Sequence, residues 1–489
     1  MSMPGRLSHL ILAFLFIVNL HQPSYGAPWY VDDSNIAGPH DGTQWQSAFR
    51  YLQDALDASM PGDTIKVAQG IHFSDDDGGF HNPSHVQDSR SESFKPKEGI
   101  TIEGGYIGFD HAAPDTRDIT NFVTILSGDL TQNDTPNLGN YDENAYHVVD
   151  LSITNDESEI NGLTITHGYA HQFVGLPSAF KKSGGGIFSD KAGGVFADAR
   201  VSNCIITGCS AESGGGGVYV RNVAEAGLRF NNCIITGNEA LGFGGGVYNT
   251  GAVLQFVGCT ISSNACVGTV ADQSGGGLYL VGVGETTLRN TQILDNSAAE
   301  GGGIYRSAGD ITLRDCLIQG NTASEGLGGG IAFTQGGGFV VLEMINCDII
   351  ENYAVGGERG GGGLYVAPHS GELEFGVDLV NCRFIGNVAT GEASGGAIWG
   401  SVIKAFSITN CLFAGNVAED RPGGALFISS VDDDGFGTVS IKNCTIADSR
   451  GRFQPELTAA PPAGRGHGPG PAGARGPSLR RFIASADGI

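Results

Sequence analysis

Three groups of acidic residues are the first candidates for chemistry in this sequence. They are Asp75–Asp77, Asp432–Asp434, and a loop that contains Asp129, Asn133, Asp134 and Asp142. Oxygen-rich groups of this kind suit Ca²⁺, which binds carboxylate and carbonyl oxygens. None of the three has the spacing and terminal glutamate of an EF-hand loop. We therefore interpret them as solvated turns, with weak calcium sites as the sharper alternative at Asp432, Asp433 and Asp434, and at Asp129 and Asp134.

Catalysis on an acidic polysaccharide would need more than a calcium site. A lyase also needs a basic residue that takes the proton α to the uronate carboxylate, and a glycosidase needs two carboxylates facing across a groove. Arg289, Arg314 and Lys442 occupy equivalent positions two residues before a repeated column of cysteines, but they belong to different repeats. Outward surface charge is the plainer interpretation of these three residues, and no catalytic residue is assigned.

A repeat of about 30 residues organises most of the chain. One part is a glycine run followed by an aliphatic and often an aromatic residue, as in Gly244–Tyr248. The other is Asn-Cys-x-Ile-x-Gly-Asn-x-Ala, complete at Asn232–Ala240. Alternation with a period of two indicates strands with one buried face, and Asn and Gly suit sharp corners. Each repeat is predicted to supply about three short strands.

Stacking explains how such short repeats form a fold. One repeat cannot bury its own apolar face, whereas stacked repeats pair each strand with its copy in the next coil. The sequence predicts an all-β, single-stranded right-handed parallel β-helix of ~12 coils over residues 64–450, with clear repeats from residue 184. Columns of Asn are expected to hydrogen-bond along the stack, since strand spacing places identical side chains ~4.8 Å apart.

The ten cysteines all fall in these columns. An even count in an exported protein normally suggests disulfides. Stacked parallel side chains point the same way, however, and suit the disulfide dihedral poorly. We favour free, buried thiols that act as small hydrophobic side chains. Metal binding is not indicated, because no Cys-x-x-Cys pair or clustered His accompanies them.

Both ends of the chain differ from the repeats. Residues 1–26 have the pattern of a signal peptide, with an apolar run that is too short to span a bilayer of about 30 Å. The mature chain is expected outside the cytoplasm, without a transmembrane helix. Residues 27–63 are predicted to carry a capping helix, with Trp45, Phe49, Leu52 and Leu56 on one face.

The last segment, residues 451–489, is rich in Pro, Gly and Arg, a composition that cannot bury a core. We expect it to lie outside the fold, as a disordered tail or as the product of a shifted reading frame.

The composition excludes one class of partner. The formal net charge is −25, and 79 residues are glycine. Nucleic-acid binding needs clustered Lys and Arg that neutralise phosphates, so we predict no nucleic-acid partner.

The repeats resemble the polymorphic outer-membrane protein repeat family. Gly395–Ile398 matches its Gly-Gly-Ala-Ile signature, and Phe384–Asn387 and Phe413–Asn416 match Phe-x-x-Asn. This resemblance implies surface exposure, a role in adhesion and association with the outer membrane. The segment Pro61–Ala68 with Gly70 is similar to the opening of many secreted β-helical polysaccharide lyases of the pectate-lyase type.

Two functions from different classes remain open. The first is a non-catalytic binding, adhesion or surface-structural protein whose partners are extracellular glycans or cell-surface components. The alternative is a calcium-dependent polysaccharide lyase or another carbohydrate-active enzyme. Three or more carboxylates converging beside an Arg or Lys in one groove would favour the enzyme.

Overall fold

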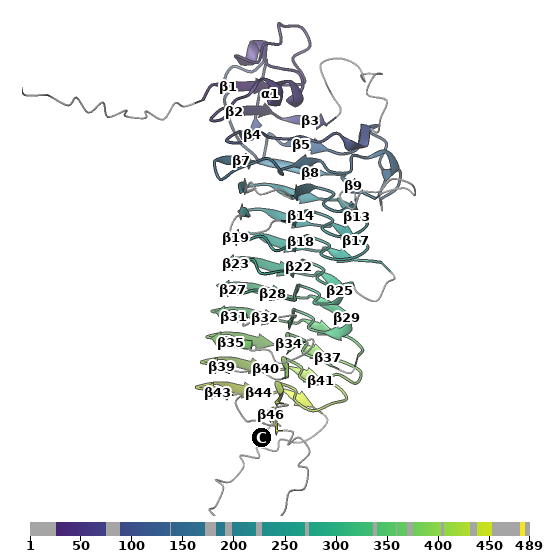
Figure 1. Ribbon diagram of the computed structural model, residues 1–489, viewed down its shortest axis with the longest axis vertical. Coiled ribbons are helices and arrows are strands. Elements are labelled where there is room, and N and C mark those ends of the chain that lie inside the picture. Colours follow the sequence, from purple (N-terminus) through teal and green to yellow (C-terminus); the bar gives the residue numbers. More distant parts are fainter. Residues whose placement is uncertain are drawn as a thin grey trace, which may run out of the picture.

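The computed structural model shows an elongated column of stacked coils (Figure 1). It describes residues 26–74, 89–136, 138–171, 182–190, 198–221, 227–268, 273–335, 340–357, 359–368, 375–401, 405–430, 438–451 and 480–484. The strands form four sheets of 13, 11, 12 and 10 strands, in which each strand pairs with its equivalent in the next coil. The predicted right-handed parallel β-helix is confirmed.

Two of the sheets begin at the N-terminal end of the column. The 13-stranded sheet contains β1 (Pro28–Val31), β2 (Thr64–Ala68), β4 (Thr101–Tyr106), β7 (Ser158–Asn161), β11 (Ala199–Ser202), β15 (Leu228–Asn231), β19 (Leu254–Val257), β23 (Thr286–Arg289), β27 (Ile311–Arg314), β31 (Val340–Ile345), β35 (Phe375–Val380), β39 (Ala405–Thr409) and β43 (Thr438–Lys442). The 12-stranded sheet contains β3 (Gly70–Phe73), β5 (Thr124–Ser127), β8 (Leu163–Thr166), β12 (Ile205–Thr207), β16 (Ile234–Thr236), β20 (Thr260–Ser262), β24 (Gln292–Leu294), β28 (Leu317–Gln319), β32 (Asp348–Ile350), β36 (Arg383–Ile385), β40 (Leu412–Ala414) and β44 (Thr445–Ala447).

The other two sheets begin further along the chain. The 11-stranded sheet contains β6 (Val149–Asp150), β10 (Ile187–Asp190), β14 (Val218–Arg221), β18 (Val247–Thr250), β22 (Leu278–Val281), β26 (Ile304–Arg306), β30 (Ile331–Gln335), β34 (Leu364–Pro368), β38 (Ile398–Ser401), β42 (Leu426–Ser430) and β46 (Arg480–Ala484). The 10-stranded sheet contains β9 (Tyr169–Ala170), β13 (Ser210–Ala211), β17 (Glu239–Ala240), β21 (Ala265–Cys266), β25 (Ser297–Glu300), β29 (Thr322–Leu327), β33 (Tyr353–Ala354), β37 (Val388–Ala389), β41 (Val417–Ala418) and β45 (Arg450–Gly451).

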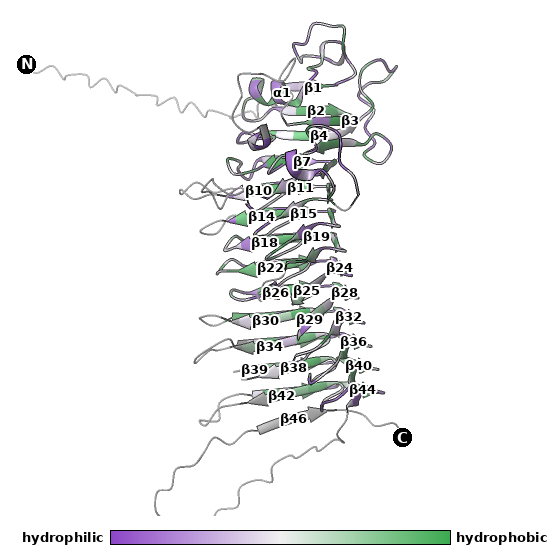
Figure 2. Cartoon of the chain, turned by 90° about the vertical axis from the view of Figure 1, so that its right-hand side faces the viewer, coloured by the Kyte–Doolittle hydropathy of each residue, from purple (hydrophilic) through white to green (hydrophobic). Residues whose placement is uncertain are grey.

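A typical coil therefore has four strands rather than the predicted three. In the coil formed by β11, β12, β13 and β14, the additional strand is β13, which has only two residues. It carries Ala211 of the alanine column and follows the corner at Gly208 and Cys209. Hydrophobic residues recur on the strands from coil to coil (Figure 2). Their buried side chains form one continuous core.

The predicted asparagine ladder is confirmed. The Nδ2 group of Asn238 donates to Oδ1 of Asn264 at 3.0 Å and to the carbonyl of Ile206 at 3.0 Å. The same Oδ1 accepts the backbone N–H of Asn238 at 3.1 Å. This pattern repeats through Asn296, Asn321, Asn352, Asn387 and Asn416, all of which are fully buried. Each coil is thus joined to the next by a polar column inside the core.

The cysteines are free thiols, as predicted. Nine are buried, and Cys444 in the last parallel coil is half-buried. Each thiol donates to main-chain carbonyls, as Cys233 does to the carbonyl of Val201 at 3.1 Å. Burial raises the pKa of Cys204 to about 12, so this thiol stays protonated near neutral pH.

The N-terminal end is closed by a helix shorter than the one predicted. A 3₁₀ turn, η1 (Trp45–Ser47), precedes α1 (Leu52–Ala58), and the chain between them is extended because Phe49 exchanges backbone hydrogen bonds with Tyr30 and Asp32. Leu52, Ala55 and Leu56 of α1 join the main core and cover the first coil. Two further 3₁₀ turns are η2 (Ser89–Ser91) and η3 (Tyr141–Glu143).

At the C-terminal end, one element differs from expectation. Strand β46 pairs antiparallel with β42, whose outer edge would otherwise leave its backbone groups unpaired. Arg480–Ala484 therefore adds to a sheet, although it belongs to the segment expected outside the fold. Gly451 of that segment also ends strand β45, whereas residues 452–479 and 485–489 and the predicted signal peptide, apart from Gly26, lie outside the described residues, so those assignments stay predictions. Within the described chain, no helix is long and apolar enough to cross a bilayer.

Candidate functional site

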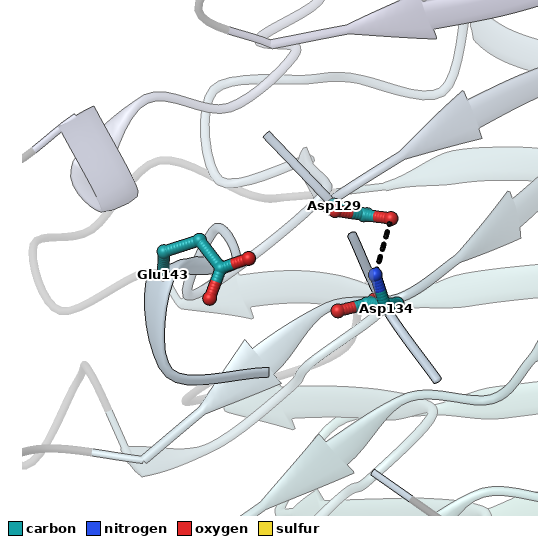
Figure 3. Close-up of side chains that lie close together, drawn as sticks. All are labelled: Asp129, Asp134 and Glu143. Atoms are coloured by element: carbon teal, nitrogen blue, oxygen red, sulfur yellow. Dashed lines mark hydrogen bonds between the residues drawn. The ribbon is translucent and has the colours of Figure 1, made fainter. Parts of the chain in front are cut away.

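One carboxylate cluster forms near the N-terminal end of the column. Asp129 follows β5, Asp134 lies five residues further along the same loop, and Glu143 ends η3. One carboxylate oxygen from each residue lies within 4.8 Å of the other two (Figure 3). The backbone N–H of Asp134 donates to Oδ2 of Asp129 at 3.2 Å, which holds two of the acidic residues together.

Neighbouring polar side chains hold the loop in this shape. The backbone N–H of Asn133 donates to Oδ1 of Asp129 at 3.1 Å, and the hydroxyl of Thr131 donates to Glu143 at 2.7 Å. The fully buried Asn144 donates to Oδ2 of Asp134 at 2.7 Å and to the carbonyl of His167 at 2.8 Å. Asn144 thereby ties the loop to the adjacent coil.

The electrostatic environment favours a proton or a cation at Asp134. Burial raises the pKa of Asp134 to about 7, and the charges of Asp129 and Glu143 act in the same direction, against the hydrogen bond from Asn144. Within the described residues, Oδ1 of Asp134 is buried and has no hydrogen-bond partner. A proton or a hard cation such as Ca²⁺ would offset the repulsion among the three carboxylates.

The structure brings together some, but not all, of the acidic residues that the sequence analysis grouped in this loop. Asp129 and Asp134 lie side by side, and Glu143 joins them in place of the expected Asp142. Sequence reasoning missed Glu143 because η3 decides which of two adjacent acidic residues faces the loop. Asp432, Asp433, Asp434 and Asp75–Asp77 lie outside the described residues. Calcium binding at Asp129 and Asp134 stays a prediction.

The basic residues of the cysteine-flanking column lie far from this cluster. Arg289 is exposed on β23, which is five strand positions beyond β4 in its sheet, or roughly 24 Å at about 4.8 Å per strand. Arg314 pairs with Glu343 at 2.6 Å on the next strand, and Arg383 forms an ion pair with Asp348. These pairs between adjacent coils fit the interpretation of outward surface charge.

A second region, which sequence reasoning missed, lies at the first coil. A cavity of about 260 Å³ opens beside α1 and β3, and its lining includes Asp33, Arg50, Tyr51 and His72. These residues come from three separate segments and carry no shared motif. The available signal was His72 itself, a polar residue at a strand position that other coils fill with Leu, Ile or Phe.

Comparison with known families identifies the architecture. Residues 185–452, more than half of the 489-residue chain, match the family model described as a right-handed beta helix region. The chain belongs to the right-handed β-helix family. No curated protein matches this β-helix chain at a significant level.

Solved structures similar to this β-helix include enzymes and an adhesin. Pectate lyase Pel9A has 11% identity and a TM-score of 0.30, with coverage of 86% of this chain and 78% of that one. A rhamnogalacturonan lyase has 12% identity and a TM-score of 0.33, with coverage of 88% and 90%. PfbA, a surface adhesin of Streptococcus pneumoniae, has 8% identity and a TM-score of 0.30, with coverage of 86% and 92%. At these scores, the likenesses carry no argument about what this β-helix does.

Proposed function

We propose that this β-helix is a secreted or cell-surface protein that binds its target without catalysing a reaction on it. The observation that carries the proposal is a row of partly exposed tyrosine side chains along the outer face of the column. The carboxylate cluster also has basic groups beside it, since Arg90 Nε donates to the carbonyl of Asn144 at 2.7 Å, and burial lowers the pKa of His167 while the charge of Asp129 raises it. Arg90 donates to the main-chain carbonyls of Asn144 and Tyr169, and we assign neither Arg90 nor His167 a catalytic role.

The surface of the column supports a binding role. Tyr219 lies between Val218 and Val220, which join the core, so the tyrosine is on the outer face of its strand. Its equivalents in the next coils are Tyr248, Tyr279 and Tyr305, with successive ring centroids 5.1–5.4 Å apart. Tyr219 is only 9% exposed and the other three tyrosines are half-buried, so the row presents partly exposed aromatic rings along the stacked coils.

The sequence supports an extracellular location for this function. Residues 1–26 have the pattern of a signal peptide, and the repeats resemble those of polymorphic outer-membrane proteins. We accordingly propose extracellular glycans or cell-surface components as partners. A calcium-dependent polysaccharide lyase is the second candidate, because three carboxylates do converge in one loop.

An activity assay separates the two candidates. Purified mature protein is incubated with polygalacturonate and with alginate, with added calcium or with a chelator, and absorbance of the unsaturated product is followed. Binding without catalysis predicts no increase above the protein-free blank in any condition. A calcium-dependent increase that Asp134→Asn abolishes, and that Asp156→Asn on another loop leaves intact, would establish the lyase instead.

A further inference from the structure

The first coil breaks the most regular column of the core. His72 on β3 pairs in register with Leu126, which pairs with Ile165, and the column continues through aliphatic or phenylalanine side chains. Its later members are Ile206, Ile235, Ile261, Ile293, Ile318, Ile349, Phe384, Phe413 and Ile446. His72 is the one polar side chain in this column of the described coils.

Stability alone does not account for this histidine. The side chain is only 3% exposed, and its contact with the carbonyl of Ala68 is 3.5 Å long, at the limit of a hydrogen bond. Burying a polar group without a good partner costs free energy that a leucine or isoleucine would not cost. A residue that weakens the core at one position suggests a role in the adjoining cavity.

Four segments of the chain meet at that cavity. Asp33 follows β1, Arg50–Leu52 leads into α1, Ile71–Phe73 belongs to β3, and Gln132 lies on the loop after β5. The volume of about 260 Å³ is just below the usual range for drug-sized ligands, so the space suits one small ring rather than a chain of them.

The charged groups in the lining nearly balance one another. Burial raises the pKa of Asp33, and the charge of the neighbouring Asp32 acts in the same direction, while a positive charge on His72 or on Arg50 lowers it. The Arg50 guanidinium also lies 5.3 Å from the centre of the Tyr51 ring. Burial lowers the pKa of His72, so the imidazole is neutral near pH 7 and offers one donor and one acceptor.

We propose that this cavity binds a single neutral pyranose at the end of an extracellular glycan. Asp33 accepts hydrogen bonds from hydroxyls, Arg50 and Gln132 donate to hydroxyl oxygens, and His72 does either. The ring of Tyr51 offers an apolar face for the sugar C–H groups. The inference rests on the proposed binding function, and it adds where the ligand binds and to which chemical class the ligand belongs.

The charges in the cavity and on the whole chain favour a neutral sugar over an acidic one. Among the described residues, Arg50 is the one cation in the lining, and the opposite charge of Asp33 lies in the same lining. The whole chain carries a formal charge of −25, which repels a polyanionic glycan as it approaches. A uronate would bring a second carboxylate beside Asp33 without a further cation to pair with it.

Saturation-transfer NMR tests this proposal on the mature protein. The probes are the methyl glycosides of glucose, galactose and mannose, with methyl galacturonate glycoside and free galacturonate as acidic comparisons. We expect transfer to at least one neutral glycoside and about tenfold weaker affinity in Asp33→Asn and in Arg50→Gln, since each removes a charge-assisted hydrogen bond. Asp41→Asn and Arg289→Gln, which change exposed charges outside the cavity, are the matched controls and should bind like the wild type.

Three other results would each reject a different part of the proposal: the neutral-sugar site, its place in the cavity, or the binding function. Absence of transfer to every neutral glycoside, or preferential transfer to galacturonate, would reject the neutral-sugar site. Transfer that persists unchanged in Asp33→Asn and Arg50→Gln would reject the cavity while leaving a glycan-binding function in place. Product formation in the polyuronate assay, by contrast, would reject the proposed function itself.

Discussion

Buried polar side chains are hydrogen-bonded differently in the asparagine ladder of the central coils and in the first coils of this β-helix. From Asn238 to Asn387, each buried amide donates to the next Asn and to a carbonyl of the preceding coil, and Asn416 donates to the Ser449 hydroxyl instead of another Asn. In the first coils, buried Oδ1 of Asp134, Oδ1 of Asn144 and Nδ1 of His167 have no hydrogen-bond partner within the described residues. Repetition allows the ladder amides to satisfy one another, whereas buried polar atoms outside the ladder, including Thr286 Oγ1 and Arg306 Nη1 in the central coils, have no partner within the described residues.

The largest expected effect comes from the aliphatic column of the central coils. Ile318 is fully buried between Ile293 and Ile349. Ile318→Ala should lower the free energy of unfolding by about 2–5 kcal/mol, through lost burial and the cavity left behind. Urea unfolding followed by circular dichroism measures the loss. Gln319→Ala, one residue further on the same strand, is the control and should cost under about 0.5 kcal/mol.

The asparagine ladder should be nearly as sensitive. Asn321 donates to the carbonyl of Ile293 and to Asn352, each at 2.9 Å, and its Oδ1 accepts from Asn296 at 3.0 Å. Asn321→Ala leaves several buried groups without partners and should cost about 2–4 kcal/mol in the same urea experiment. A loss below about 1 kcal/mol would show that the ladder positions the coils without stabilising them.

A smaller effect, in the first coils, concerns pH. The pKa of Asp134 is raised to about 7, above the value near 3.9 of an unfolded aspartate. The folded chain therefore holds this proton more tightly, so its stabilising effect is present at low pH and is lost as pH rises toward 7. Unfolding midpoints between pH 5 and 8 should fall with pH in the wild type and fall less in Asp134→Asn.

Calcium binding at the same residue should show the opposite dependence on pH. Binding requires an ionised Asp134, so calcium affinity should increase as pH rises through about 7. Titration calorimetry at pH 6 and pH 8 measures this difference, with Asp134→Asn as the variant expected to bind least. Equal affinities at both pH values would remove Asp134 from the set of ligands.

The same contrast explains what sequence reasoning could predict. The columns of Cys, Ile, Asn and Ala recur through the central coils with few exceptions, such as Thr291 in the Cys column and Phe384 in the Ile column. Burial and strand register therefore follow from a local pattern that is repeated many times. The loop with Asp129 and Asp134 was predicted from composition, but the choice of Glu143 over Asp142 depends on η3. The cavity was not predictable, because Asp33, Arg50 and His72 meet only when β1, α1 and β3 pack together.

The His72→Leu variant tests most directly whether His72 lowers the stability of the first coil and is needed for ligand binding. Leucine would complete the column above Leu126 and remove a buried imidazole that has one marginal hydrogen bond. The free energy of unfolding is expected to rise by roughly 1–3 kcal/mol, while binding of the neutral glycoside is lost. A lower free energy of unfolding, with glycoside binding retained, would contradict the account and make His72 a structural residue.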